Sequence, residues 1–398
     1  MLKVFFFLLL LPPLRLSLWL GQKRNLSLGL RMLGICGFFL ISQQFTLNKL
    51  LFGGLSGPDI PYVLLLCQSA ALTALVVIFF CLLGHDLVRL LGFIGRLWRS
   101  RRPKPPDPGR RQCLTGLFGQ SMLFSVPALG LSAGALGVAQ GTAIPRLCEH
   151  QVELAHLPEQ VKGLRLALLS DLHIGPLTSL AWAGSIVEQI QAAKPDLICL
   201  AGDLADGQLG YHSADGATRR EVASLFGKLS APLGVFACTG NHEYYSDYAG
   251  WMQLYQSLGI HFLHDNAVLL PYNGATLVLG GRDDKQAGTF FHRKRQPASV
   301  VFAGMPWHGQ KAVRLLLDHR PDRARENAAY ADLQLSGHTH GGQCLGLDRL
   351  VARVNRGFLR GWYTVEAMRL YVCPGTGLWS GFPVRLGVAS EIALISLA

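Results

Sequence analysis

Acidic residues are scarce in the first part of this 398-residue chain. Up to residue 150 it carries 4 Asp and Glu against 15 Lys and Arg, whereas the remainder carries 21 against 22. The basic excess lies between long apolar runs, as the topology signals of membrane proteins do. A nucleic-acid-binding surface would instead place this charge on the folded domain, so we expect no nucleic-acid partner.

Paired cysteines are missing as well. The nine cysteines are scattered, and no two of them have the CxxC spacing. This argues against a disulfide framework and against a zinc site built from cysteines. Cys199 and Cys238 lie in strand-like apolar runs, where cysteine usually acts as a small buried hydrophobic residue. Cysteine usage therefore leaves the redox compartment open.

Charged residues are also nearly missing from four apolar runs within residues 1–145, and these runs predict a membrane domain. The expected transmembrane spans are 4–20, 32–48, 61–84 and 113–139. As a helix, the uncharged run 61–84 would be about 36 Å long, enough for a bilayer core. The first run contains Pro12, Pro13 and Arg15, so three spans remain the alternative to four.

The placement of basic residues predicts the orientation. The loop 89–112 contains eight Arg and Lys residues, so the positive-inside rule places it in the cytoplasm. The chain after the last span is then extracytoplasmic. We therefore expect a linker, 146–160, and a second domain, 161–398, on the outer side of a cell (inner) membrane, with the lipid bilayer as a partner.

From residue 164 onward, short apolar strands alternate with helical segments. The expected strands are 164–170, 196–202, 234–240, 275–281, 312–318, 331–337 and 370–375. The expected helices are 179–192, 217–229 and 247–258. This βαβ order predicts a layered α/β domain, whose ligands would bind beyond the carboxyl ends of the strands.

Metal-ligand residue types occur at five strand ends. The segments are Asp171-Leu172-His173, Gly202-Asp203, Gly240-Asn241-His242-Glu243, Asp318-His319 and Gly337-His338-Thr339-His340. Taken alone, the first four can be explained by a turn, a helix cap or a surface histidine. The last is harder to explain in this way, because its two histidines are flanked by glycines in a loop that could present both rings. Together they offer carboxylate, amide and imidazole ligands without thiolates, a set that suits manganese, iron or zinc better than calcium. Because the carboxylate of Asp203 could bridge two ions, the sequence predicts a two-metal phosphate-ester hydrolase.

The order of the motifs DLH, GDLAD, GNHE, DH and GHTHGGQ resembles the calcineurin-like metallophosphoesterases, and within them a membrane-anchored bacterial branch. The similarity covers about residues 160–398 and implies an α/β four-layer (α-β-β-α) sandwich after the transmembrane helices. At Ala389-Ser390-Glu391 the sequence departs from the family, in which a proline would precede the glutamate. This departure affects a C-terminal strand and not the metal site.

The resemblance also implies a role for each site residue. A first metal ion would be bound by Asp171, His173, Asp203 and His340, and a second by Asp203, Asn241, His319 and His338. The two ions (Mn, Fe or Zn) would activate a bridging hydroxide that attacks phosphorus. His242 would act as general acid. Asp206 would orient it, and the alternative for Asp206 is an ordinary loop carboxylate.

The substrate is the property that the sequence defines least. The segments 206–216 and 288–305 are expected at the rim of the site. The second contains aromatic and basic residues, which suit a phosphate beside an apolar or base-like group but more often form a solvated charged surface. Tethering to a bilayer suggests a lipid or lipid-linked phosphoester, and the resemblance to the membrane-anchored branch implies nucleotide-linked lipids. We therefore expect a phosphodiester or diphosphate of a lipid or nucleotide-linked lipid as the substrate, rather than a monoester. The alternatives are a non-catalytic metal-binding scaffold or receptor, and a transporter, which the nearly uncharged spans disfavour.

Overall fold

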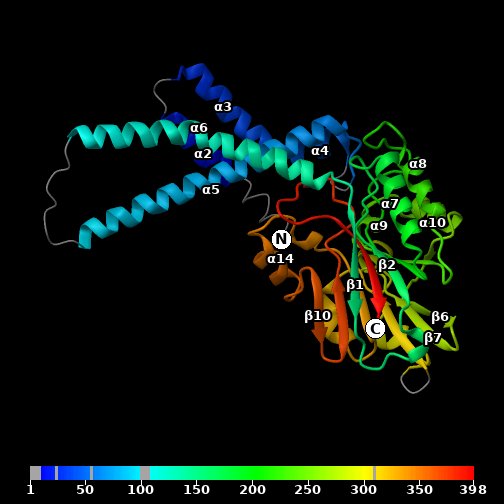
Figure 1. Ribbon diagram of the computed structural model, residues 1–398. Helices are drawn as coiled ribbons and strands as arrows, with labels where there is room; N and C mark the ends of the chain where they lie inside the picture. Colours follow the sequence, from blue (N-terminus) through cyan, green and yellow to red (C-terminus); the bar gives the residue numbers. More distant parts are fainter. Residues whose placement is uncertain (1–9, 23–25, 54–56, 99–107, 308–310) are drawn as a thin grey trace. The chain divides into compact units, whose positions relative to one another are not determined.

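The computed structural model describes residues 10–22, 26–53, 57–98, 108–307 and 311–398 (Figure 1). The chain forms two compact units. The helical unit consists of Met1–Asn48 and Val63–Val138, and the α/β unit of Lys49–Tyr62 and Ala139–Ala398. The α/β unit therefore includes a short stretch that precedes the longest helix of the chain.

The helical unit consists mainly of apolar helices. They are α2 (Leu11–Gly21), α3 (Leu28–Ser42), α4 (Gln44–Phe52), α5 (Tyr62–Trp98) and α6 (Pro108–Gly141). Among the described residues, Tyr62–Gly95 is long and apolar enough to cross a membrane, and α3 with α4 qualifies only if this pair, bent by 66°, is one span. By length and composition the described helices thus provide one candidate span, or two.

Two sequence expectations for this unit need correction. The expected span 32–48 contains a break at Gln43, where the polar pair Gln43-Gln44 interrupts the apolar run and the helix axis bends. The expected basic loop 89–112 is helical at both ends, because α5 continues to Trp98 through Leu and Arg residues that favour helices. Residues 4–9 and 99–107 lie outside the described part of the chain.

Polar side chains tie the helices of this unit together. Arg15 on α2 donates to both carboxylate oxygens of Asp86 on α5, at 2.6 and 2.8 Å. Asn48 and Gln68 exchange two amide hydrogen bonds between α4 and α5. Gly134 lies against the Ala70 carbonyl, where a Cβ would come within 2.4 Å, so α5 and α6 approach closely. The arginine of the first apolar run is therefore paired rather than exposed to an apolar environment.

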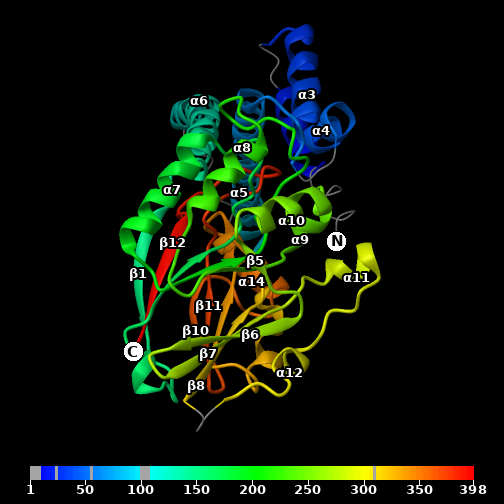
Figure 2. The ribbon, with the colours of Figure 1, turned by 90° about the vertical axis from the view of Figure 1, so that its right-hand side faces the viewer.

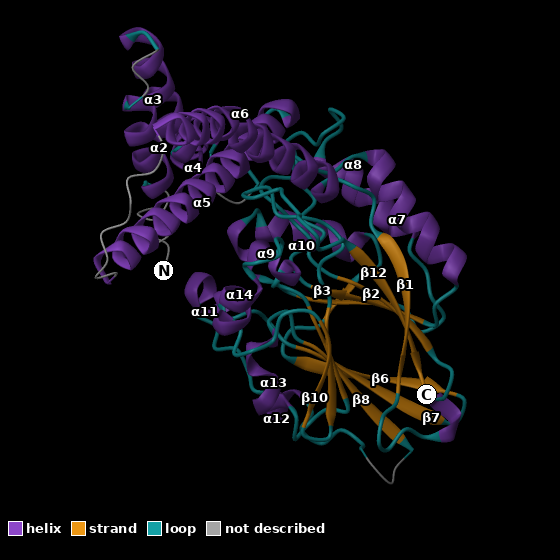
Figure 3. Cartoon of the chain, turned by 60° about the vertical axis from the view of Figure 1, so that its left-hand side comes forward, coloured by secondary structure: helices purple, strands orange, loops and turns teal. Residues whose placement is uncertain are grey.

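The strands of the α/β unit form two six-stranded mixed sheets that face each other (Figure 3). The first has the order β1-β12-β2-β3-β4-β5 and the second β10-β11-β9-β8-β7-β6. The strands are β1 (Arg146–Val152), β2 (Arg165–Leu169), β3 (Leu197–Ala201), β4 (Val235–Cys238), β5 (His261–Phe262), β6 (Asn266–Tyr272), β7 (Ala275–Gly281), β8 (Ala312–Leu317), β9 (Leu333–Ser336), β10 (Gly361–Val365), β11 (Met368–Val372) and β12 (Glu391–Leu397).

Parallel pairing dominates the middle of both sheets. Strands β2 to β5 pair in parallel in the first sheet, as do β7, β8, β9 and β11 in the second. The short helices are α7 (Leu180–Ala193), α8 (Arg219–Ser224), α9 (Asn241–Tyr245), α10 (Tyr248–Ser257), α11 (Gln286–Phe291), α12 (Ala298–Val301), α13 (Ala324–Asn327) and α14 (Asp348–Val354). The 3-10 turns are η1 (Glu159–Val161), η2 (Leu225–Lys228), η3 (Pro321–Arg323) and η4 (His340–Gly342).

Buried apolar side chains explain why these strands associate. Leu168 of β2 and Leu317 of β8 belong to one cluster that both sheets share. A second cluster packs α7 and α10 against the first sheet and includes Ile186 and Trp251. A third packs α12 and α13 against the second sheet. The α/β class predicted from the strand pattern is confirmed.

The expected linker 146–160 contributes a strand, which the sequence analysis did not foresee. Strand β1 occupies Arg146–Val152 and pairs in parallel with β12 along its whole length. Its sequence, RLCEHQV, lacks an apolar run because this edge strand is only partly buried. The α/β unit therefore begins before residue 161 (Figure 2).

Candidate metal centre

The candidate ligands follow strands whose carboxyl ends meet at one edge of the two sheets. In the first sheet Asp171 and His173 follow β2, Asp203 follows β3 and Asn241 follows β4; in the second, His319 follows β8, and His338 and His340 follow β9. Six of the seven are buried and His338 is half-buried. All seven expected ligands therefore lie at this edge, five in loops and two at the starts of α9 and η4, although they are up to 169 residues apart in the chain.

Three groups among the described residues bring ligand atoms within 4.8 Å of one another and could hold a metal ion. They are Asp171 with His173 and His340, His173 with Asp203 and His242, and Asp203 with His319 and His338. The first and third groups coincide with parts of the two ligand sets implied by the resemblance. Asp203 belongs to two groups, and its Oδ2 lies 3.1 Å from Nε2 of His319 and 3.9 Å from Nε2 of His173.

The backbone of the ligand loops is strained. Five of the seven candidate ligands adopt positive φ angles: Asp171 (54°), His173 (45°), Asp203 (54°), His338 (72°) and His340 (47°). A left-handed conformation costs a non-glycine residue about 1–2 kcal/mol, and such residues cluster at functional sites. The surrounding fold therefore holds these side chains in orientations that ordinary loops would not select.

Close packing between the loops explains why glycine occurs at position 202 of the GD motif and glutamate at position 243 of the GNHE motif. Gly202 has a φ of 79°, and a Cβ there would lie 2.6 Å from the Gly240 nitrogen and 2.9 Å from Nδ1 of His319. The buried Glu243 carboxylate accepts hydrogen bonds from the backbone nitrogens of Gly240 (2.6 Å), Asp203 (3.0 Å) and Leu204 (2.5 Å). Glu243 thus joins two ligand loops. In the sequence, Glu243 had no indication of a role beyond a helix cap.

Asp206 lies between two histidines. Its Oδ1 is 2.5 Å from Nδ1 of His242 and 3.2 Å from Nδ1 of His173. Burial lowers the pKa of His242, but the carboxylates of Asp206 and Asp203 outweigh burial and raise this pKa to about 9. The two carboxylates therefore favour the protonated form of the His242 imidazole, and Asp206 orients its Nδ1.

Arg320 contacts two candidate ligands and was not singled out as a site residue. Its guanidinium donates to Oδ1 of Asn241 at 2.6 Å and lies 2.6 Å from Nε2 of His338, while its Nε pairs with Asp284. The signal was present in the sequence, because Arg320 follows His319 directly and Asp284 ends the GRDD segment. This part of the site therefore offers a positive charge where an anionic group could bind.

The histidines fit a bound cation. Burial lowers the pKa of His338, as do Arg320 and His319, and burial together with His173 lowers the pKa of His340. Both imidazoles are therefore neutral, the form that binds metals. Among the described residues, the buried Nδ1 atoms of His338 and His340 have no hydrogen-bond partner, whereas Nε2 of His319 lies 3.1 Å from Oδ2 of Asp203. Unpaired imidazole nitrogens in a cluster with carboxylates are compatible with binding of a divalent ion.

Comparison with known proteins agrees with this geometry. The family model of calcineurin-like phosphoesterases matches residues 164–342. A zebrafish (Danio rerio) protein named "Transmembrane protein with metallophosphoesterase domain" is 30% identical over 373 residues, which cover 91% of this chain and 76% of that protein. This chain belongs to the calcineurin-like phosphoesterase family. The family expected from the five motifs is thereby confirmed.

Other calcineurin-like phosphoesterases match over different lengths. The Bos taurus protein of the same name is 30% identical, with 85% of this chain and 74% of that protein covered. An uncharacterized metallophosphoesterase of Helicobacter pylori (strain ATCC 700392 / 26695) is 30% identical, with 66% of each chain covered. Because these relatives come from animals and bacteria, the comparisons do not single out the bacterial branch that the sequence suggested.

The expected rim segments of this phosphoesterase differ in character. The segment 206–216 is anchored by backbone hydrogen bonds such as that from Asp206 to Ile174. In the segment 288–305, Arg293 pairs with the buried Asp283, and Arg295 pairs with the buried Asp318. These two arginines therefore neutralise internal carboxylates, which a merely solvated charge run would not do. The ring of Phe290 packs against that of Tyr245 at a tilt of 58°, with 5.8 Å between the ring centroids.

Proposed function

We propose that this protein is a membrane-anchored, dinuclear-metal phosphoesterase that hydrolyses a phosphodiester or diphosphate of a lipid or nucleotide-linked lipid. The observation that carries the proposal is the convergence of carboxylate and imidazole groups from both sheets around Asp203, within 4.8 Å. In this proposal the first ion is bound by Asp171, His173, Asp203 and His340, and the second by Asp203, Asn241, His319 and His338. Manganese, iron and zinc all suit this donor set.

In this proposal the residues of the chain have different roles in the reaction. Two divalent ions would clamp the phosphate oxygens and lower the pKa of water between them. His242 donates a proton to the leaving oxygen, because Asp206 holds its Nδ1 at 2.5 Å and leaves the other ring nitrogen available. The Arg320 guanidinium binds a phosphate oxygen on the opposite side of the site. We also propose that helices on the outer faces of the sheets complete a four-layer α-β-β-α sandwich.

The membrane arrangement is a second part of the proposal. The relatives named as transmembrane proteins and the apolar helix α5 support a membrane anchor before a catalytic domain. On the apolar runs of the sequence we propose four spans, with three as the alternative. We place that domain outside the cytoplasm of an inner membrane, on the charge placement of the sequence. A reporter enzyme fused after Ala398 should then be active only outside the cytoplasm, and activity inside would reverse the orientation.

An activity assay tests the catalytic part. The full chain, loaded with Mn²⁺, is offered para-nitrophenyl phosphate, bis(para-nitrophenyl) phosphate and a panel of phospholipids and lipid-linked diphosphates. We expect the diester to be cleaved faster than the monoester, and a lipid substrate to be cleaved best. A metal-loaded protein that cleaves none of these would favour the alternative of a non-catalytic metal-binding scaffold or receptor.

A further inference from the structure

The α/β unit joins the rest of the chain at the same edge that carries the metal ligands. Just before α5, the carbonyl oxygens of Gly57 and Pro58 accept hydrogen bonds from the buried Arg219 at 2.6 and 2.7 Å. The same guanidinium donates to the carbonyl oxygen of Asp206 at 2.9 Å. The stretch that leads into the apolar helix α5 is therefore fixed to the backbone of a residue beside His242.

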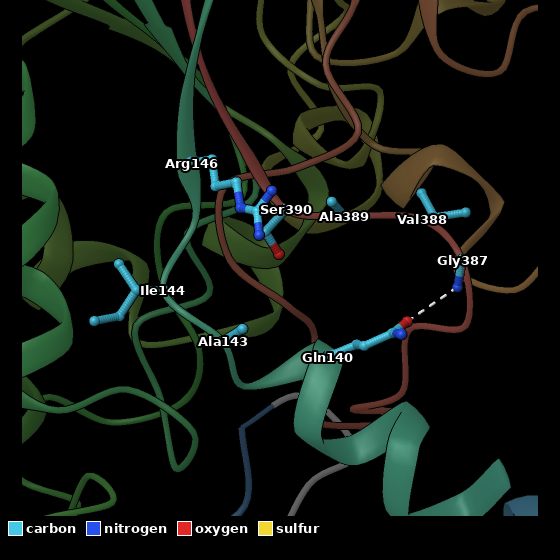
Figure 4. A pocket seen from close by; sticks show the side chains of 8 residues that line it. All are labelled: Gln140, Ala143, Ile144, Arg146, Gly387, Val388, Ala389 and Ser390. Carbon is cyan, nitrogen blue, oxygen red and sulfur yellow. Dashed lines mark hydrogen bonds between the residues drawn. The ribbon is translucent and has the colours of Figure 1, made fainter.

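The second junction lies at this edge too. At the end of α6, Oε1 of Gln140 accepts a hydrogen bond of 3.0 Å from the Gly387 nitrogen, at the side of a cavity of about 320 Å³ (Figure 4). Next to it, a Cβ on Gly141 would lie 2.8 Å from the Leu378 side chain. Trp379 follows Leu378 in the chain, and its ring centroid lies 6.0 Å from that of His242. Both junctions thus lead from the surroundings of His242 toward long helices.

Large apolar side chains are exposed at this edge. They are Phe290 and Phe291 of α11, Leu345, and Leu350 and Val354 of α14, each between 49% and 63% exposed. Helix α11 packs on α9, which begins with Asn241, through the ring pairs Phe290–Tyr245 and Phe291–Tyr244. Helix α14 follows η4, the turn that contains His340. The apolar groups therefore lie on helices adjacent to two of the candidate ligand segments.

Basic side chains alternate with these apolar ones. On α14 the exposed Arg349 and Arg353 each precede an exposed apolar residue, and Lys294 is exposed shortly after α11. The acidic residue of α14, Asp348, pairs with Arg360 at 3.0 Å. Solvation of the basic residues does not explain why large leucine and phenylalanine side chains are exposed beside them. Apolar residues that insert beside basic residues are typical of segments lying in the headgroup layer of anionic membranes.

We propose that this membrane-facing rim (Phe290, Phe291, Leu345, Arg349, Leu350, Arg353 and Val354) lies in the headgroup layer of a bilayer that contains anionic lipids. The metal centre then opens toward the membrane surface. A lipid would present its phosphate there without leaving the bilayer completely, a consequence that rests on the proposed function. The partner of the rim is the lipid surface and not a soluble protein, because Leu345 packs against Gly387, which binds Gln140 at the end of the long helix α6.

Photocrosslinking of the full-length protein tests the rim. A diazirine-bearing amino acid replaces Leu345 in one sample and Val300 in another, because Val300 on α12 is exposed to a similar degree, 51%. Both proteins are reconstituted in vesicles of phosphatidylcholine alone or mixed with phosphatidylglycerol, and lipid adducts are counted by mass spectrometry. We expect at least several-fold more adduct at 345 than at 300, and more with phosphatidylglycerol. Equal yields at the two positions would overturn the proposal.

A charge insertion provides the matched comparison. Leu350→Glu with Val354→Glu should lower the adduct yield at position 345 several-fold, because two carboxylates are repelled by the anionic headgroups. Leu269→Glu with Val300→Glu introduces the same charges at equally exposed positions and should leave the yield unchanged. An unchanged yield in the rim variant would refute the docking. Because adducts form without turnover, a rim that crosslinks in a protein without hydrolytic activity would refute only the proposed function.

Discussion

The two halves of the metal centre are held by side chains of opposite charge. On one side the carboxylate of Asp206 lies between His173 and His242. On the other side the guanidinium of Arg320 lies between Asn241 and His338. Histidines that lie close together can therefore differ in protonation, because each has a different charged neighbour.

The protonation of the histidines follows this difference. Carboxylates raise the pKa of His242 to about 9, whereas burial and Arg320 lower that of His338. The first histidine is thus prepared to give a proton, and the second to bind a cation through a neutral nitrogen. Asp203 lies between the halves and contacts a histidine of each, His173 and His319.

Asp203→Asn should have the largest effect, because it removes the carboxylate that both halves share. We expect the turnover of bis(para-nitrophenyl) phosphate to fall on the order of a thousand-fold or more. Metal analysis of the purified protein should show fewer ions bound per chain. Asp215→Asn, which changes an exposed loop carboxylate, is the control and should retain both. Full activity in Asp203→Asn would remove this residue from the centre of the mechanism.

His242→Ala tests the carboxylate-held half. A general acid contributes about 10²–10⁴-fold, and its contribution grows as the leaving group becomes more basic. The variant should therefore lose about a hundred-fold or more with an alkyl phosphodiester but far less with a para-nitrophenyl ester, while its metal content stays unchanged. Asp206→Asn should show the same leaving-group dependence with a smaller loss. Equal losses for both leaving groups would mean that His242 does not act as the acid.

Arg320→Ala tests the guanidinium-held half. If Arg320 binds a phosphate oxygen, KM should rise about ten-fold, the equivalent of one charge-assisted hydrogen bond. The metal content should stay unchanged. Arg323→Ala changes an exposed arginine that pairs with Glu326 and serves as the control. Tighter metal binding with an unaltered KM would instead show that Arg320 competes with the second ion for Asn241 and His338.

The loop positions of the seven proposed ligands were predictable from the sequence, because each one follows an apolar strand and the order of the motifs resembles that of the family. The contacts that hold the ligand loops in place were not predictable from the sequence. Glu243 holds the Asp203 loop through backbone nitrogens 38 to 40 residues away. Strand β1 lacks an apolar run and pairs with β12 about 245 residues later. Such partners are selected by tertiary packing, and no local pattern records them.

Arg219→Gln should have the smallest catalytic effect and a clear effect on stability. Its guanidinium is completely buried and joins the carbonyl oxygens of Gly57, Pro58 and Asp206, three acceptors that an amide side chain cannot reach together. We expect a loss of about 2–3 kcal/mol in the free energy of unfolding, the usual contribution of charge-assisted hydrogen bonds. Activity should fall less than in Asp206→Asn, because the Asp206 carboxylate itself remains.

The neighbouring Arg220 provides the control, because it is exposed and its replacement by Gln should leave the unfolding temperature unchanged. If Arg219→Gln were as stable as Arg220→Gln, the stretch before α5 would not be a structural part of the α/β unit. If Arg219→Gln instead lost stability and showed the leaving-group dependence of Asp206→Asn, the carboxylate-held half would depend on that stretch. The guanidinium-held half has no corresponding contact with residues 57–60 among the hydrogen bonds of the described residues. The two halves would then also differ in that only the carboxylate-held half is hydrogen-bonded, through Arg219, to the described stretch before α5.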